Sequence, residues 1–306
     1  MNSSITEPQA PSDRYRSGFI AIVGRPNVGK STLLNQILGQ KISIISDKPQ
    51  TTRNRILGVK HLPEAQMVFF DTPGVHKART KLNQRLVQAA LDSLQEVDLI
   101  FFLVGPDAEP GEGDLFITDY LKDIKTPKIL VVNKVDLVKK ERLIPILDFY
   151  GRRGSFSEMI PISALTGDNV DRLLEVALSH LPEGEPYFPE DVVTDQPVRF
   201  LAAEIIREKV ILKTREEIPY SVAVQIEDFK EDEAKNLSAI QAVIFVEKES
   251  QKGIIIGRKG GMLKEIGTDA RKELEALLGT KIFLELWVKV KKDWSKSDSF
   301  LKEMGY

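Results

Sequence analysis

Residues 19–31 read FIAIVGRPNVGKS. The last eight of these, Gly24 to Ser31, match the pattern GxxxxGK[ST], in which a glycine-rich loop wraps phosphate oxygens with its backbone N–H groups. The apolar run before the loop predicts a buried strand, and STLLNQIL after it predicts a helix. This is the setting that a phosphate loop requires, so we expect a P-loop NTPase sheet.

Within this loop we expect Lys30 to reach the β- and γ-phosphates of a nucleotide and Ser31 to ligate Mg²⁺. The other residues expected around the phosphates are Gly24, Arg25, Pro26, Asn27, Val28, Gly29 and Thr32.

The amino-acid composition bounds the number of domains and excludes several kinds of metal and disulfide site. The 306 residues exceed the usual size of one domain, and 42% hydrophobic with 29% charged residues is ordinary for a globular protein. There is no cysteine and there are three scattered histidines, which excludes disulfides and thiolate or histidine metal clusters. Residues 1–17 read as a loose polar leader, and no apolar run approaches the ~20 residues of a membrane span. We therefore expect a cytoplasmic protein.

Alternating strand and helix patterns run from residue 18 to residue 182. The expected strands are residues 19–24, 56–62, 67–71, 98–105, 128–133 and 159–163, and helical periodicity begins at residues 30, 81, 112, 140 and 169. This alternation predicts an α/β fold with a doubly wound, mostly parallel sheet. A Pro-Glu turn between the second and third strands predicts one antiparallel strand.

A second domain follows a linker. Residues 183–197 are rich in proline and acid, which is typical of a boundary. Beyond it we expect a smaller α+β domain over 198–292, with a helix at 198–212, strands at 221–227 and 239–249, helices at 249–256 and 262–278, a strand at 281–291, and a tail at 293–306.

The motif NKVD, Asn133 to Asp136, favours guanine as the base. It follows a predicted strand, at the edge where open α/β sheets bind ligands. The Asp136 carboxylate can accept two hydrogen bonds from guanine, and adenine offers no such pair. Asn133 would brace the loop, the stem of Lys134 would cover one ring face, and PISALTG adds Ser163 and the Ala164 N–H. Alone, NKVD could be a surface turn; behind a phosphate loop it is specific.

Two further loops lie between these motifs. DTPG supplies Asp71, Thr72, Pro73 and Gly74, and QTTR spans residues 50–53. We expect Asp71 to hold Mg²⁺ through water and the Gly74 N–H to meet the γ-phosphate, while Thr52, or alternatively Thr51, closes over the metal. Loops ordered by a triphosphate and released after hydrolysis act as a switch.

A second glycine loop, QKGIIIGRKGGML, lies at residues 251–263. It does not fit a second phosphate loop, because Lys259 precedes the closing glycine and no hydroxyl follows to bind Mg²⁺. A plain turn would need fewer glycines. A cationic GxxG loop clamps about four nucleotides in KH domains, so Gly257, Arg258, Lys259 and Gly260 are candidate RNA-binding residues. The α-β-β-α-α-β order is similar to a type II KH domain, and Trp287 and Trp294 fit packing positions.

The order and spacing of GRPNVGKS, QTTR, DTPG, NKVD and ISA, followed by this domain, resemble the Era GTPase family within the Era/TrmE-like GTPases. The resemblance implies a Ras-like G domain that hydrolyses GTP to GDP with Mg²⁺. It also implies binding near the 3′ end of small-subunit ribosomal RNA and a role in assembling the small ribosomal subunit.

One position departs from the Ras-like pattern. Val75 stands where a glutamine would orient the attacking water. No catalytic side chain is therefore assigned beyond Lys30 and Thr52; the backbone at Gly74 and Val75, a K⁺ held by Asn27, or a partner would assist. We expect slow turnover that a partner raises.

The charge distribution bears on the RNA partner. Net charge is −2, and residues 201–306 carry 19 Lys and Arg against 19 Asp and Glu, so binding must depend on local cations such as Lys289 and Lys291. Two rival functions stay open: a nucleotide-dependent metabolic enzyme, and a GTP-sensing adaptor at a membrane or on proteins. The sequence also leaves open peripheral association with the cytoplasmic face of the membrane, and we expect a monomer.

Overall fold

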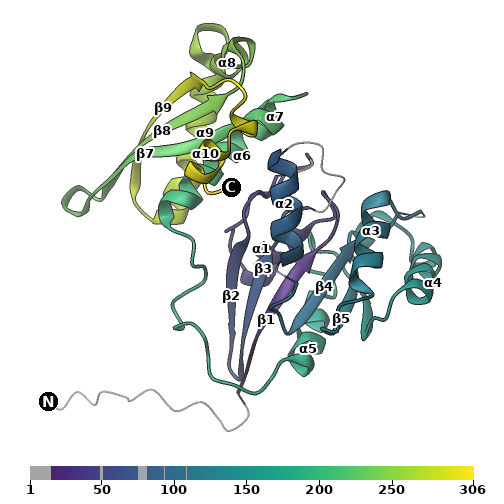
Figure 1. Cartoon of the computed structure of the whole chain (residues 1–306). Helices are drawn as coiled ribbons and strands as arrows, with labels where there is room; N and C mark the ends of the chain where they lie inside the picture. Colours follow the sequence, from purple (N-terminus) through teal and green to yellow (C-terminus); the bar gives the residue numbers. More distant parts are fainter. Residues whose placement is uncertain (1–14, 49–50, 75–80, 93, 108) are drawn as a thin grey trace, which may run out of the picture.

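The computed structural model describes residues 15–48, 51–74, 81–92, 94–107 and 109–306, apart from the side chains of residues 81, 83 and 89. In the first half a six-stranded sheet has the order β2-β3-β1-β4-β5-β6 (Figure 1). Its strands are β1 (Arg16–Val23), β2 (Ile56–Leu62), β3 (Ala65–Asp71), β4 (Leu99–Val104), β5 (Lys128–Val132) and β6 (Glu158–Pro161). The strands pair in parallel except β2, which is antiparallel to β3, as the Pro-Glu turn predicts.

Helices cover both faces of this sheet. The helices are α1 (Lys30–Leu38), α2 (Lys81–Asp92), α3 (Glu112–Leu121), α4 (Leu143–Arg153) and α5 (Val170–His180). Apolar residues of α1 and α5 share one core with one face of the strands, while α2, α3 and α4 share the other. Strands β4 and β5 are buried on both sides, which explains their continuous apolar runs. The doubly wound α/β fold is confirmed.

The second half forms a three-stranded sheet of order β7-β8-β9, in which β8 is antiparallel to β7 and parallel to β9. The elements are α6 (Val198–Lys213), α7 (Ile218–Ser221), β7 (Ala223–Asp232), β8 (Leu237–Val246), α8 (Glu249–Ile256), α9 (Gly261–Leu278), β9 (Lys281–Val290) and α10 (Asp298–Glu303). Helices α6, α8 and α9 pack with the sheet around one apolar core. No helix in the described ranges has the length and apolar character needed to cross a bilayer.

The sequence-based bounds of β7 and β8 were wrong at both ends of each strand. The predicted strands at 221–227 and 239–249 are in fact a longer hairpin, which continues to Asp232 and resumes at Leu237. The sequence pattern misled because a bulge between Ile226 and Asp228 interrupts the alternation and the extension carries charged side chains. Backbone pairing continues there although Phe229 is the one apolar residue of β7 beyond the bulge.

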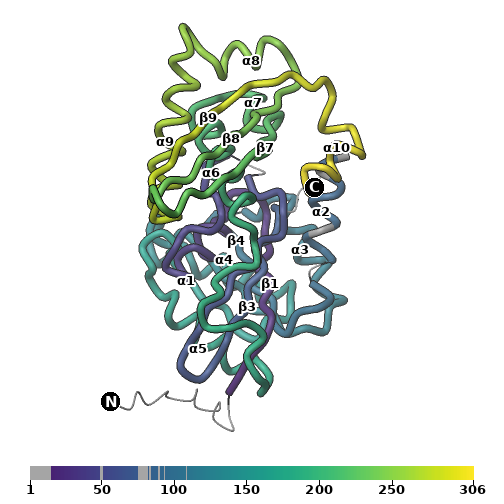
Figure 2. The backbone as a smooth tube through the Cα atoms, turned by 90° about the vertical axis from the view of Figure 1, so that its left-hand side faces the viewer, coloured from purple at the N-terminus to yellow at the C-terminus, as the bar shows by residue number. Residues whose placement is uncertain are grey.

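The segments at both ends of the second domain lie against the first. Within 183–197, the Val193 carbonyl accepts a hydrogen bond from Val59 N (2.8 Å), and the Phe188 carbonyl accepts one from Gln66 Nε2 (2.7 Å). The predicted tail, 293–306, contains α10 beside α2 (Figure 2). Trp294, with none of its surface exposed, belongs to a cluster with Leu82 of α2 and Phe300, whereas Trp287 is 42% exposed. Only Trp294 therefore fits the packing role expected of both tryptophans.

Candidate functional site: a phosphate loop, a metal corner and a glycine-bounded groove

The phosphate loop between β1 and α1 is packed too tightly for side chains at its glycines. A Cβ at Gly24 would lie 2.4 Å from the Leu103 carbonyl oxygen. Gly29 has φ 98°, and a Cβ there would lie 2.3 Å from Asn133 Nδ2. Because α1 begins directly after this loop, its unpaired N–H groups face the site where phosphates would bind.

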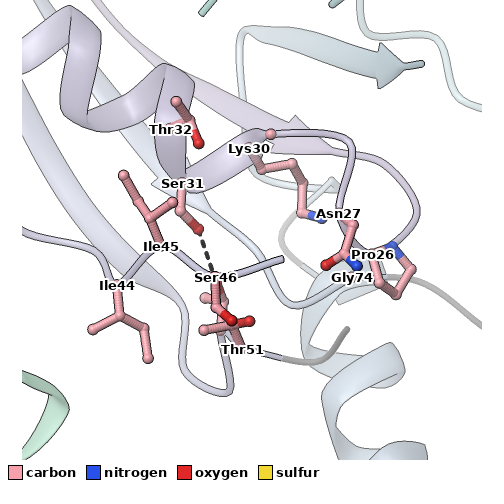
Figure 3. Close-up of a pocket in the computed structure, with 12 residues that line it drawn as sticks. Pro26, Asn27, Lys30, Ser31, Thr32, Ile44, Ile45, Ser46, Thr51 and Gly74 are labelled. Carbon is pink, nitrogen blue, oxygen red and sulfur yellow. Dashed lines mark hydrogen bonds between the residues drawn. The ribbon is translucent and has the colours of Figure 1, made fainter. Parts of the chain in front are cut away.

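A pocket opens beside this loop (Figure 3). In the close-up, Lys30 and Asn27 lie to the right of Ser31, and Ser46 and Thr51 lie below it. The loop residues therefore face the segment that the sequence predicts to respond to nucleotide. The lining residues are Pro26, Asn27, Gly29, Lys30, Ser31, Thr32, Ile44, Ile45, Ser46, Thr51, Thr52 and Gly74.

Lys30 is a buried cation. Its Nζ donates to the carbonyl oxygens of Gly24 and Arg25, both at 3.1 Å. Burial lowers the pKa of Lys30 to about 8, against the attraction of Asp71. Two carbonyl oxygens only partly replace the water molecules that would surround an exposed ammonium group. A phosphate beside Lys30 would supply an opposite charge in direct contact with this buried ammonium group.

Three predicted metal-site residues meet at the carboxyl end of β3. Ser31 Oγ lies 2.6 Å from Asp71 Oδ2 and 2.9 Å from Thr52 Oγ1. Asp71 Oδ2 also accepts from Ser43 Oγ at 2.8 Å, a buried contact that the sequence did not predict. Ser43 is held by Asn35 of α1, whose Oδ1 accepts from Ser43 N at 3.0 Å. A Ser and an Asn without a motif gave no sequence signal for this support.

This corner suits Mg²⁺. Mg²⁺ binds oxygen at about 2.0–2.1 Å in an octahedron, so two adjacent ligands lie about 2.9 Å apart. The two hydroxyls of Ser31 and Thr52 have that separation. Asp71 is buried, which raises the pKa of its carboxyl, and its Oδ1 has no hydrogen-bond partner among the described residues. A carboxylate oxygen left in this condition can accept from a metal-bound water.

The base corner is built by NKVD. Asn133 Nδ2 donates to the Val28 carbonyl at 2.8 Å, which ties this motif to the phosphate loop. Asp136 is exposed, and its Oδ1 accepts from Ser163 Oγ at 2.6 Å, which orients the carboxylate. The Ala164 N–H, expected to meet guanine, donates here to Asn133 Oδ1 at 2.9 Å. Lys134 spans the site, with Nζ 2.6 Å from the Asn27 carbonyl.

Some predicted residues support the site without lining the pocket. Arg25 turns to the carboxylates of Asp107 and Asp114, the latter at 2.9 Å from Nε. Thr72 is buried and donates from Oγ1 to the Ile22 carbonyl of β1 at 2.8 Å. Val75 and Gln50 lie outside the described residues.

The GRKG loop connects α8 to α9 with two glycines at positive φ. At Gly257 (φ 71°) a Cβ would lie 2.6 Å from the Met262 Cβ, so no side chain fits. At Gly260 (φ 76°) a Cβ would meet nothing within 4 Å. Arg258 and Lys259 between them are exposed. The loop thus presents cations and an open backbone surface.

A groove of about 550 Å³ begins at this loop and runs between α9 and β9. Gly260 lies at one end, Lys264 and Arg271 supply cations, and Leu284 supplies an apolar contact. The sequence predicted Gly260 as an RNA-binding residue and Leu263 as part of the core or groove floor; the other lining residues are far from the loop in the chain or carry no motif. The complete lining is Gly260, Leu263, Lys264, Gly267, Thr268, Arg271, Leu284 and Leu286.

The two predicted strand lysines do not line this groove. Lys289 Nζ pairs with Glu227 of β7 at 2.7 Å. Lys291 Nζ lies 3.7 Å from the centre of the Phe300 ring. In this structure Lys289 therefore contacts β7, and Lys291, directly after β9, contacts α10; RNA binding by either lysine stays a prediction.

Comparisons with known proteins agree with both halves. A family model described as 50S ribosome-binding GTPase matches residues 19–134, and a KH domain model matches residues 217–295. A protein named GTPase Era from Geobacter metallireducens is 56% identical over 292 residues, which cover 95% of this chain and 98% of the relative. The GTPase Era of Geotalea daltonii is 57% identical over 293 residues, with 96% and 98% covered.

Two solved structures are similar over nearly the whole length. One is Era in complex with MgGDPNP and nucleotides 1506–1542 of 16S ribosomal RNA; it shares 47% identity, with a TM-score of 0.92, and the match covers 95% of this chain and 99% of that one. The other is a point variant of Aquifex aeolicus Era bound to GDP.AlF4⁻, with the same identity, TM-score and coverage.

Proposed function

The chain belongs to the Era family of GTPases, and we propose that its GTP hydrolysis depends on Mg²⁺ and controls a KH domain that binds single-stranded ribosomal RNA. The product of the cycle would be GDP and phosphate. The partner would be the 3′ region of small-subunit RNA, and the process would be assembly of the small ribosomal subunit. The cytoplasm, where that assembly takes place, is the proposed location.

The observation that carries the metal assignment is the corner formed by Ser31, Thr52 and Asp71. Ser31 and Thr52 would bind Mg²⁺ directly, and Asp71 would hold one of its waters. The ion would neutralise charge on the β- and γ-phosphates as the bond to the leaving group breaks. Lys30 would contact the same phosphates, and the Gly74 N–H would meet the γ-phosphate.

Positioning of the attacking water needs another group, because Val75 has no polar side chain. A K⁺ ion is the proposed aid, with Asn27 as its protein ligand. Asn27 lines the pocket, and its Nδ2 donates to the Asp47 carbonyl at 2.6 Å, which holds the amide in place and leaves its Oδ1 as the proposed ligand atom. Replacing K⁺ by Na⁺ at equal ionic strength should lower turnover and leave nucleotide affinity unchanged. Equal turnover in the two salts would contradict the K⁺ proposal.

The RNA assignment rests on the groove that begins at Gly260. The exposed cations of the loop would hold phosphates, and the apolar wall of β9 would contact bases. The related Era structure contains RNA from the 3′ region of 16S, at 47% identity to this chain. This groove favours RNA binding over the rival functions, a metabolic enzyme or a protein adaptor, because neither accounts for it.

The test is a Gly260→Asp variant, compared with Gly279→Asp. Both glycines are left-handed, with φ 76° and 67°, and a Cβ at either meets nothing within 4 Å. Aspartate tolerates this conformation better than most residues, so both variants should fold. Gly279 is at the far end of α9, about 27 Å from Gly260 for an 18-residue helix.

Affinity for a single-stranded RNA with the 3′ sequence of the small-subunit RNA should fall at least tenfold in Gly260→Asp only. Fluorescence anisotropy would measure it, and GTP hydrolysis would serve as the folding control. Equal affinities for the two variants would refute the groove as the RNA site. Sedimentation of the wild type alone and with lipid vesicles would test the expected monomer and any peripheral membrane association.

A further inference from the structure

The loop that carries Thr52 is attached to the second domain. Helix α6 and the segment after it contact residues 41–48 and 51–53, here called the switch segment. Lys41 Nζ lies 2.6 Å from Glu208 Oε2, and Ile45 N donates to Glu208 Oε1 at 2.9 Å. Lys48 donates to the carbonyl oxygens of Ile211 and Thr214 at the end of α6. The side chain of Ile44 belongs to the apolar core of the second domain.

The contact nearest the metal corner is made by Arg207. Its Nη2 donates to the carbonyl oxygen of Thr51, the residue directly before Thr52. Glu204 fixes the guanidinium by accepting from Nε at 2.7 Å and from Nη2 at 2.6 Å. Arg207 is completely buried and Glu204 is 7% exposed, so the pair has little freedom to rotate.

Arg53, on the other side of Thr52, is also bound to the second domain. Its Nη1 donates to the Val222 carbonyl at 2.7 Å and its Nη2 to the Tyr220 carbonyl at 3.0 Å. The guanidinium carbon lies 5.5 Å from the ring centre of Trp294. The backbone carbonyl before Thr52 and the side chain after it are therefore both held by residues outside the nucleotide-binding domain.

A buried ion pair is weak support for a purely stabilising role, since apolar residues of similar volume often stabilise as well or better. What Arg207 and Glu204 add is orientation: a rigid fork aimed at one carbonyl. Rotation of the peptide between Thr51 and Thr52 would move the Thr52 hydroxyl away from Ser31 Oγ, which it now approaches to 2.9 Å.

We propose that Arg207 is a positioning residue for the metal site: held by Glu204, it fixes the Thr51 carbonyl and thereby sets Thr52 for Mg²⁺. The inference rests on the proposed role of Ser31 and Thr52 as Mg²⁺ ligands. The second domain then completes the metal site of the first. By linkage, any partner that displaces α6 weakens Mg²⁺ binding in the triphosphate state, and Mg²⁺ binding resists that displacement to the same degree.

The variant for the test is Glu204→Leu with Arg207→Met, which replaces the pair without leaving a lone buried charge. Arg207→Lys keeps a cation beside Glu204 and loses the planar fork. Arg199→Met changes an exposed arginine of the same helix and serves as the control. Fluorescence of buried Trp294 would verify that the second domain is folded in each variant.

Two measurements are needed, both without RNA. Calorimetric titration of Mg²⁺ into protein saturated with a non-hydrolysable GTP analogue gives the Mg²⁺ dissociation constant, and the Mg²⁺ dependence of hydrolysis gives its half-saturation. Both should rise ~10–100-fold in the double variant, the range seen when supporting residues of metal ligands are removed. They should rise by a smaller factor in Arg207→Lys and stay unchanged in Arg199→Met.

GDP affinity in the absence of Mg²⁺ separates positioning from general damage, because Thr52 is needed only with the γ-phosphate. It should stay within about twofold of wild type in every variant, whereas a purely structural role would weaken it too. Unchanged Mg²⁺ constants in a folded double variant would overturn the role of Arg207. A wrong assignment of the metal site itself would give a different result. Wild type would then hydrolyse GTP without Mg²⁺, or Ser31→Ala would bind Mg²⁺ as tightly as wild type does.

Discussion

Replacing Lys30 by methionine should stabilise the nucleotide-free protein and abolish binding of nucleotide. The pKa of Lys30 falls from 10.5 to about 8 because of burial. One unit of pKa difference corresponds to about 1.4 kcal/mol, so holding the charged form at pH 7 costs about 3 kcal/mol. The methionine variant also loses the two hydrogen bonds that Lys30 donates to loop carbonyls, which reduces its gain in the free energy of unfolding by about 1 kcal/mol. We expect the variant to be about 2 kcal/mol more stable at pH 7.

The sign of the pH dependence follows from the two pKa values. Between pH 8 and pH 10.5 the unfolded chain still binds the Lys30 proton and the folded chain has lost it. Unfolding therefore takes up a proton, and the wild type becomes more stable as pH rises through this window. By pH 9.5 the cost of the charge has fallen by about 2 kcal/mol, so the advantage of the methionine variant should disappear.

Urea-induced unfolding followed by pulse proteolysis would measure this difference at pH 7 and pH 9.5, using peptides of the first domain. Both tryptophans lie in the second half of the chain, so their fluorescence would report the other domain. Lys125→Met, at an exposed lysine between α3 and β5, should change neither stability nor its pH dependence. A Lys30→Met variant no more stable than wild type at pH 7 would refute this explanation. So would a variant that kept its extra stability at pH 9.5, because the buried charge of Lys30 would then not be what destabilises the wild type.

Two more predictions concern the proposed base and metal sites. Asp136→Asn should shift nucleotide preference from GTP to xanthosine triphosphate, because the amide donates where the carboxylate only accepts. Competition binding would measure the preference. If the variant still preferred GTP as strongly as the wild type, Asp136 would not be the residue that recognises the base. Since burial raises the pKa of Asp71, its carboxyl takes up a proton at higher pH than an ordinary aspartate. As the pH is lowered, Mg²⁺ affinity should therefore begin to fall before the pH reaches ~4, where an ordinary aspartate takes up its proton. Asp71→Asn should remove this pH dependence. If calorimetry gave parallel pH profiles for the variant and the wild type, Asp71 would not be the group responsible.

Motifs in a single loop were the part of this protein that sequence could predict. Lys30 and Ser31 belong to one short loop, and Asn133 and Asp136 to another, so spacing alone defines each pair. Their common location follows from the parallel sheet, whose carboxyl edge gathers the loops.

Contacts between distant residues were not predictable in this way. Arg207 and Thr51 are 156 positions apart, and no pattern in either segment refers to the other. Ser43 is one unremarkable serine until the fold places it beside Asp71. For Lys289 and Lys291 the sequence showed only a run of cations; their partners on other elements became visible with the tertiary structure, and RNA binding by these two lysines stays a prediction.

The cluster formed by Trp294, Phe300 and Leu301 with Leu82 and Leu86 bears on the order of synthesis. A chain made from its amino terminus folds its first domain first. Helix α2 would therefore keep an apolar face uncovered, and Arg53 would lack its contacts with the rings of Trp294 and Tyr306, until residues 294–306 have been added. The contacts of Arg207 and Glu208 with the switch segment involve residues made earlier, so they can form before this cluster does. Loss of residues 294–306 is therefore expected to uncover α2 and to loosen Arg53, while α6 still holds the Thr51 carbonyl.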